Sequence, residues 1–501
     1  HPGGSWPIRV VADWEDGSVS DVEAQLVTDD DGLVSIDGMV VEAVSKGTAS
    51  VTAKWAGHQD QMVVTILDDN QLRVTVVAAE DGTPIEGVKL KSDDDATPEY
   101  TDEMGVAAVV VTTGGPLSVT AYLSGYLPVT IVNTVARDVV IPLRSMEVFT
   151  SELGEVAGEV NYDDVPEGAF DDIIVGLAAP SFRTSPLLLN PDDLLAEDRT
   201  VDVFGVEANI PSNVYVREVA DSYAVPILPG DGAVWTIAGA LPIADVTGNL
   251  SGADDALALM QEHMDGMVWS WAVASNVESG ESVSADLAPD TSLASTFAVD
   301  VGDLSLGFNG DEDAFVMVGE VLSEEGMVVT GLGLGTGVVS VSHSGQTFDD
   351  SIGSVAAAVV QVDGLGSGGA VCASYVEVDA DASAAGAVVL PALPLVADLA
   401  GFDPETREFS VVTDPATTIV NVVIEGGDGT LRELYFAGDE QIGVLSNPGF
   451  PFGFARTTWS VVGLQLNTET FEGLLSQGDL LMEQLVGDAS TSSQLVQDVH
   501  P

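Results

Sequence analysis

Apolar and polar residues alternate along most of the chain, in short runs separated by turn-forming residues. Between residues 8 and 66 these runs are "IRVVADW", "VEAQLVT", "LVSIDGMVVEAV", "ASVTAKWAG" and "MVVTIL", and Asp-Gly, Lys-Gly and Gly-His breaks lie between them. A period of two over four to eight residues is typical of half-buried strands, and helical periodicity is absent. Residues 1–69 are therefore predicted to form an all-β sandwich.

A second set of alternating runs follows the linker "LDDNQ". The runs are "LRVTVVAA", "GVKLKS", "GVAAVVVTT", "LSVTAYLSGYLPVTI" and "RDVVIPL". They predict a small seven-stranded sandwich that ends near Leu143, and the second domain is therefore expected to cover residues 70–144.

Residues 145–501 are predicted to form a larger β-rich domain, either single or divided into two subdomains. Gly, Asp and Pro breaks recur about every ten residues between β-branched runs there, which is typical of antiparallel sandwiches. Helices are expected at residues 251–264, with Ser251 as N-cap, and at residues 468–487, where Gly473 and Gly478 interrupt the pattern. The predicted fold class is mainly all-β, with tandem sandwich modules, a larger β-rich domain and one or two short helices.

The first domain resembles a known family. "WEDGSVSDVEAQL", "VSIDGMVVEAVSKGTASVTAKWAG" and "VVTI" are similar, in this order, to bacterial immunoglobulin-like domains of the Big type. The similarity covers about the first 68 residues. It implies a spacer or display module of a bacterial surface or secreted protein, without catalytic residues.

The second domain resembles the carboxypeptidase regulatory-like, transthyretin-like family. The resemblance rests on "DGTPIEGVKL", "TDEMG", "SGYLP" and the closing "IPL", again in the family's order. It implies a small β-sandwich that accompanies another activity, and the zinc-binding H-x-x-E of the peptidase does not occur. Residues 145–501 resemble no family.

The charge of the chain excludes one class of partner. The sequence has 14 Lys and Arg against 80 Asp and Glu, for a net charge of −66. Such a chain lacks the basic stripe that nucleic acid requires, and an anionic membrane surface repels it. Because 46% of the residues are apolar, the chain still has enough material for a core. Two interpretations stay open: adaptation to a high-salt environment, or a secreted protein whose charge calcium partly neutralises.

The expected location is extracellular or on the cell surface. The sequence begins at His1 instead of a methionine, so we expect that a signal peptide has already been removed. The longest uncharged run, residues 327–348, alternates with period two and is interrupted by glycines, so no direct membrane insertion is expected. The single cysteine, Cys372, excludes an internal disulfide and is expected to be a buried strand residue.

Acidic segments are candidate calcium sites, because Ca²⁺ prefers carboxylate oxygens. An EF-hand loop needs a glycine at its sixth position, and the loop that starts at Asp93 has Pro98 there. The sites would therefore be irregular loops, and for residues 93–95 the alternative is a solvated turn. The candidate metal ligands are Asp93, Asp95, Asp311, Asp313, Asp379 and Asp381. No other cofactor is expected.

Aromatic residues are few, so their clusters are informative. Phe450, Phe452 and Phe454 alternate in a Pro- and Gly-rich segment beside Arg456, and these four residues are the candidate ligand or partner surface. The alternative is a loop whose rings are tucked into the end of a sandwich. Trp269 and Trp271 are expected to be core residues on one face of a strand.

The sequence shows no catalytic motif. His343 lies between two serines without a G-x-S-x-G elbow, and 80 acidic residues make any single carboxylate pair uninformative. The prediction is a non-catalytic secreted or cell-surface bacterial protein with a structural, adhesive or assembly role and its specific activity in residues 145–501. The expected partners are other copies of itself, surface proteins or polysaccharides. Two alternatives stay open: a carbohydrate-active or other hydrolytic enzyme with its site in the C-terminal domain, and a calcium-dependent polysaccharide-binding protein.

Overall fold

A computed structural model describes most of the chain. The residues described are 5–13, 19–66, 71–92, 97–111, 116–146, 153–169, 172–182, 198–203, 206–217, 219–242, 259, 261–302, 314–322, 325–348, 351–362, 368–378, 387–394, 398–402, 408–426, 430–438, 442–444, 457–467, 470–477, 480, 485 and 489–499. Strands dominate these ranges, and the predicted mainly β fold class is confirmed.

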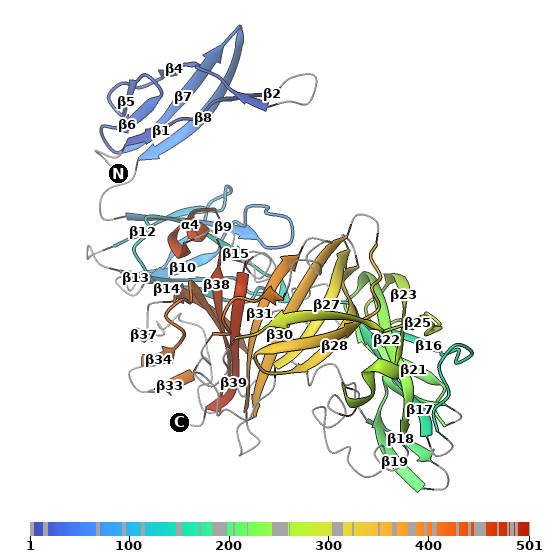
Figure 1. Cartoon of the computed structure of the whole chain (residues 1–501). Coiled ribbons are helices and arrows are strands. Elements are labelled where there is room, and N and C mark those ends of the chain that lie inside the picture. Colours follow the sequence, from blue (N-terminus) through green and yellow to red (C-terminus); the bar gives the residue numbers. More distant parts are fainter. Residues whose placement is uncertain are drawn as a thin grey trace.

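The first eight strands pair only with one another and form the N-terminal module, residues 5–66 (Figure 1). One sheet has β1 (Ser5–Pro7), β6 (Val40–Ala43) and β5 (Val34–Asp37), a second has β4 (Gln25–Thr28), β7 (Gly47–Trp55) and β8 (His58–Ile66), and β2 (Val11–Asp13) pairs with β3 (Val19–Asp21). Val34, Val41, Val51 and Ile66 are buried between the two sheets. The alternation of the sequence therefore gives each strand one apolar face.

Residues 71–143 build two layers. β9 (Gln71–Ala78) lies between β12 (Val106–Val110) and β15 (Asp138–Leu143) in a three-stranded sheet. The other layer has β10 (Lys89–Ser92), β11 (Glu99–Tyr100), β13 (Leu117–Tyr122) and β14 (Val129–Thr134), and it continues beyond this segment.

That second layer is the beginning of a 15-stranded sheet, which runs in the order β11-β10-β13-β14-β36-β35-β38-β39-β31-β30-β27-β28-β29-β26-β32. Its further strands are β26 (Ser295–Asp300), β27 (Ala314–Leu322), β28 (Gly326–Gly335), β29 (Val338–His343), β30 (Ile352–Val362), β31 (Gly368–Val378), β32 (Val388–Val389), β35 (Ile419–Gly426), β36 (Leu431–Ala437), β38 (Thr457–Leu466) and β39 (Ala489–Val499). β14 and β36 pair in parallel, with Ile131 opposite Tyr435.

Residues 154–292 form two further sheets beside the large one. The first has the order β21-β16-β24, and the second has the order β20-β17-β22-β23-β25. The strands are β16 (Gly154–Glu159), β17 (Asp172–Pro180), β20 (Val214–Val216), β21 (Ser222–Ile227), β22 (Gly230–Pro242), β23 (Val268–Val277), β24 (Ser282–Ser284) and β25 (Thr291–Ser292), and β18 (Asp198–Val203) pairs separately with β19 (Val206–Pro211).

A small sheet and a helix complete the described fold. The sheet has β33 (Asp398–Phe402), β34 (Glu408–Val412) and β37 (Ile442–Val444). The helix α4 (Phe471–Gln477) buries Phe471, Leu474 and Leu475, and it packs against β15. These three side chains share one hydrophobic cluster with residues 71–143 and with β36 and β38.

The structure refines several sequence-based predictions. The helix predicted at residues 468–487 is described at 471–477, and it continues through Gly473 because its apolar face is buried. Within the helix predicted at residues 251–264, Leu259 and residues 261–263 are helical, and a 3-10 turn, η3 (Met264–Gly266), follows. Trp269 and Cys372 are buried, as predicted, whereas Trp271, also predicted as a core residue, is only half-buried. The division into domains at residues 69 and 144 stays a prediction.

Candidate functional site

The residues proposed from the sequence as ligands all lie outside the described part of the chain. These are the acidic candidates Asp93, Asp95, Asp311, Asp313, Asp379 and Asp381, and the candidate surface of Phe450, Phe452, Phe454 and Arg456. Their roles therefore stay predictions. Among the described residues, no group of three or more His, Cys, Asp or Glu side chains is arranged to hold a metal ion, and no helix is long and apolar enough to cross a membrane.

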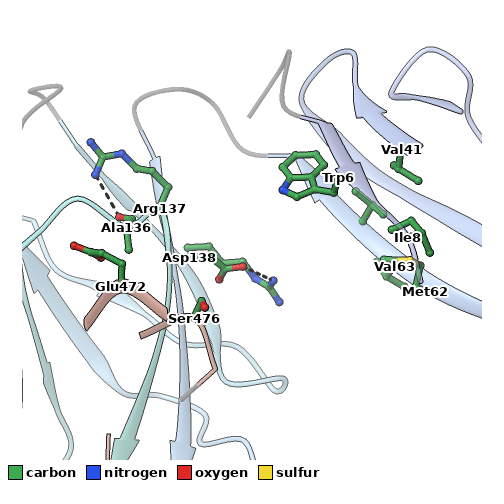
Figure 2. Close-up of a pocket in the computed structure, with 12 residues that line it drawn as sticks. Trp6, Ile8, Val41, Met62, Val63, Ala136, Arg137, Asp138, Glu472 and Ser476 are labelled. Atoms are coloured by element: carbon green, nitrogen blue, oxygen red, sulfur yellow. Dashed lines mark hydrogen bonds and ion pairs between the residues drawn. The ribbon is translucent and has the colours of Figure 1, made fainter. Parts of the chain in front are cut away.

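A groove of about 540 Å³ lies between the N-terminal module and residues 73–138 (Figure 2). Its first wall belongs to the module and is apolar, with side chains from both of the module's sheets. The exposed fractions are 45% for Trp6, 41% for Met62 and 65% for Val63. The other apolar lining residues are Ile8, Val41 and Val64.

The module's wall is apolar because one side of its sandwich is open. β1 lies at one edge of its sheet and β8 lies at one edge of the other. Between these edges the core residue Val41, 1% exposed, still reaches the groove. The lining of the groove therefore includes a residue of the module's own core.

The opposite wall is charged. Arg73 of β9 forms an ion pair of 3.4 Å with Asp138 of β15, through Nη1 and Oδ2. Arg137, the residue before Asp138, donates from Nη1 to the carbonyl of Ala136 at 3.3 Å. Two of the chain's 14 basic residues therefore face this groove.

Helix α4 contributes the end of the charged wall. Glu472 accepts a hydrogen bond from Thr134 Oγ1 at 3.1 Å, which ties the first turn of the helix to the end of β14. Ser476 lies one turn further along and also lines the groove. The helix is held in this position by the burial of Phe471, Leu474 and Leu475.

The geometry of this groove is suited to binding. An apolar wall with exposed Trp and Met side chains, opposite a wall with paired charges, offers both contact area and orienting polar groups. Sequence reasoning missed this site because its residues come from three distant segments. The one available signal was the run of consecutive apolar residues at 62–64 in a predicted strand, but strand alternation alone does not tell which apolar residues stay uncovered.

The structure assigns His343 a structural position. It ends β29, its Nδ1 accepts a hydrogen bond from the backbone N–H of Gly345 at 3.1 Å, and its ring packs edge-on against Phe297 with centroids 6.1 Å apart. Burial lowers the pKa of His343, because the charged form loses its hydration.

We expect His343 to make the protein less stable in mild acid. Its folded pKa lies below the unfolded value of about 6.5, so as the pH falls through that range the unfolded state takes up a proton first and stability is lost. The test is to compare the midpoint of thermal unfolding at pH 7.5 and pH 5.5 for the wild type and for His343→Gln. The variant is expected to lose less stability on acidification, and equal losses in both proteins would contradict the prediction.

Comparison with known proteins gives only distant similarities. No protein-family profile and no curated protein matches the chain. Among solved structures, a streptococcal ancillary pilin is 12% identical, over 50% of this chain and 79% of that chain, with a TM-score of 0.14. The shaft pilin of Lactobacillus rhamnosus GG is 8% identical, over 44% of this chain and 97% of that chain, with a TM-score of 0.12.

A third structure has longer coverage. A tetra-tandem repeat from the extending region of a large adhesion protein is 12% identical, over 84% of this chain and 92% of that chain, with a TM-score of 0.12. TM-scores this low carry no argument about the function of the chain. The resemblances of the first two domains to the Big type and to the carboxypeptidase regulatory-like family have no matching profile, and they stay predictions.

Proposed function

We propose that the chain is a non-catalytic secreted or cell-surface protein with a structural and adhesive role, and that it acts by non-covalent binding. The observation that carries the proposal is the groove at the N-terminal module. Trp6 and Met62 are 45% and 41% exposed on its apolar wall, and large apolar side chains exposed together are typical of interaction surfaces.

The architecture supports the same role. Among the described residues, the strands of the N-terminal module pair only with one another, whereas strands of residues 89–134 and 295–499 share the 15-stranded sheet, and residues 72–143 share a hydrophobic cluster with β30, β31, β35, β36, β38 and α4. The continuous hydrogen bonding of a large sheet stiffens it, and the module is attached at one end of this support (Figure 1). This arrangement suits a protein that presents a binding surface away from its point of attachment.

The sequence-based prediction located the specific activity in residues 145–501. The groove at residues 6–64 and 73–138 favours the other end of the chain for binding. The candidate ligands of the calcium-dependent polysaccharide-binding alternative lie outside the described ranges, and the hydrolytic alternative has no named residues, so both stay predictions.

A bead-adhesion assay tests the proposed function. Beads that carry the chain through a C-terminal tag are placed on surfaces coated with mucin, collagen, chitin or the chain itself. We expect adhesion above that of albumin-coated beads on at least one surface. Trp6→Ser should lower it severalfold, since exposed Trp side chains contribute strongly to interfaces.

The matched control is Val273→Ser. Val273 in β23 is 45% exposed, like Trp6, and does not line the groove, so its replacement should leave adhesion unchanged. If wild-type beads bind none of the four surfaces more than albumin beads do, the proposed function is wrong.

A further inference from the structure

Strand β8 is the longest open edge among the described sheets. It has nine residues, from His58 to Ile66, and β7 is its one neighbour among the strands that the structure describes. The other edge strands are shorter: they have two residues in β11, β25 and β32, three in β1, β2, β3, β20, β24 and β37, four in β4 and β5, five in β12 and β33, and six in β15, β18, β19 and β21. Short edges are one way in which proteins avoid pairing with other chains.

The edge of β8 presents backbone groups in a fixed pattern. β7 and β8 are joined by a two-residue turn, Ala56–Gly57, in which both φ angles are positive (48° and 88°). Such a turn makes the flanking pair, Trp55 and His58, a hydrogen-bonded pair. The even residues of β8 therefore bond to β7, and residues 59, 61, 63 and 65 direct N–H and C=O groups outward.

An observed contact agrees with this pattern. The N–H of Gln61 is accepted by the side chain of Asp60 at 2.8 Å, so it does not point toward β7. The register from Gly47–Ile66 to Trp55–His58 is continuous, without a bulge that would twist the edge away. The edge is thus regular along its whole length.

One side chain of β8 covers part of this edge, since the Asp60 carboxylate accepts the outward N–H of Gln61. Asp60 is the one charged residue among the nine when His58 is neutral, and the strand contains no Lys, Arg or Pro. Residues 58–63 are all exposed, and Val63 is 65% exposed. An exposed edge of this length with a single charged residue is a template for an added strand.

We propose that β8 of one copy pairs antiparallel with β8 of a second copy, so that the two three-stranded sheets become one six-stranded sheet. This proposal rests on the proposed function, because it describes how copies of a structural and adhesive protein would bind one another. We take the partner to be a second copy, because an added strand must be long enough to pair with all nine residues of β8 and must carry little charge. Within the described part of the chain, β8 is the one edge strand with that length.

A two-fold axis at Met62 gives the longest pairing. All nine residues are then paired, with Met62 opposite Met62 of the second copy and Gln61 opposite Val63. Even residues face even residues, so each face of the joined sheet keeps its character. Asp60 faces Val64 and His58 faces Ile66, so no like charges lie opposite each other.

Salt is expected to favour this pairing. Each copy carries a net charge of −66, so two copies repel each other at low ionic strength. The Debye length falls from about 10 Å at 0.1 M to about 3 Å at 1 M salt, and this screens the repulsion while the backbone hydrogen bonds and apolar contacts of β8 remain.

Crosslinking at Met62 tests the register. Opposed residues in a non-hydrogen-bonded antiparallel pair have Cα atoms about 4.5 Å apart, which a disulfide spans. Met62→Cys should therefore form disulfide-linked dimers under mild oxidation, with a higher yield at 1 M than at 0.1 M NaCl. Cys372 does not interfere, since it is buried and burial raises the pKa of its thiol to about 12.

The matched control is Val27→Cys on β4, the opposite edge of the same sheet. Val27 is 38% exposed, close to the 41% of Met62, but its strand has four residues. We expect at least a tenfold lower dimer yield for Val27→Cys. Equal yields from the two variants would overturn the proposal.

A second variant tests the hydrogen bonds. The N–H of Val63 points outward, so Val63→Pro removes an edge donor without breaking a bond to β7. In light scattering at 1 M NaCl, we expect the wild type to dimerise and Val63→Pro to stay monomeric with an unchanged unfolding midpoint. A wild type that is monomeric at 1 M NaCl, or a dimer unaffected by Val63→Pro, refutes β8 pairing. If β8 pairing is refuted but the wild-type beads of the adhesion assay still bind mucin, collagen or chitin, the proposed function stands.

Discussion

Replacing Arg432 by alanine is expected to lower the free energy of unfolding by about 3 kcal/mol or more, since it removes several buried hydrogen bonds from a charged donor and leaves a cavity. Arg432 is 0% exposed. Its Nη2 donates to Thr130 Oγ1 at 2.9 Å and to Thr120 Oγ1 at 3.4 Å, and its Nε donates to Thr130 Oγ1 at 3.2 Å. These contacts tie β36 to β14 and β13.

Urea unfolding, with hydrogen exchange of the β14 and β36 amides, measures the effect of Arg432→Ala. Exchange should accelerate first at β14, because the lost contacts join that strand to β36. Arg432→Met is the matched variant: it fills most of the volume without a charge to desolvate, and it should lose less stability. If the alanine variant unfolds within about 0.5 kcal/mol of the wild type, the size of a surface substitution, the buried guanidinium is not what holds the junction.

Replacing Trp269 by alanine is expected to cost about 3–5 kcal/mol, the range for emptying a buried aromatic site. Trp269 is 2% exposed in β23, and its indole N–H donates to the carbonyl of Val329 in β28 at 2.8 Å. β23 and β28 belong to different sheets, so this side chain holds the five-stranded sheet against the 15-stranded one. Thermal unfolding and proteolysis of residues 154–292 measure the loss.

Two variants separate the contributions at this position. Trp269→Phe keeps most of the apolar contact and leaves the Val329 carbonyl without its donor, so it should cost about 1–3 kcal/mol. Trp271→Ala is the control: Trp271 is only half-buried and packs edge-on against Phe348 with centroids 4.7 Å apart. The order of stability should be wild type, Trp269→Phe, Trp269→Ala, and a larger loss for Trp271→Ala than for Trp269→Ala would contradict this explanation.

The strands were predictable from the sequence because their pattern is local. Alternation marked the strands of the N-terminal module, and it also placed Trp269 on the apolar face of a strand. The pairing of β14 with β36 was not predictable, because no local signal tells a strand which distant strand will lie beside it. The helix at residues 468–487 was expected to be interrupted at Gly473, but burial of Leu474 and Leu475 outweighs the low helix propensity of glycine.

The candidate site was less predictable than the fold. Folding brings together the residues of the groove, Arg73, Asp138 and Glu472 on one wall and Trp6 and Met62 on the other. None of them belongs to a sequence motif. The acidic runs are a weaker signal than they look, because in a chain with 80 acidic residues a cluster of carboxylates is expected by chance. Met62 and Val63 can be recognised as site residues only from their exposed fractions in the folded protein.

The pairing of β14 with β36 has a consequence for synthesis of the chain. Ile131 pairs with Tyr435, which is synthesised about 300 residues later. At roughly 5–20 residues per second, translation of that interval takes roughly 15–60 s. Throughout that interval one side of β14 has no permanent neighbour, although Val129 and Ile131 are buried in the finished protein. During this time the unpaired side of β14 can associate with other nascent chains. The yield of the folded protein should therefore depend on chaperone supply and on the rate of translation.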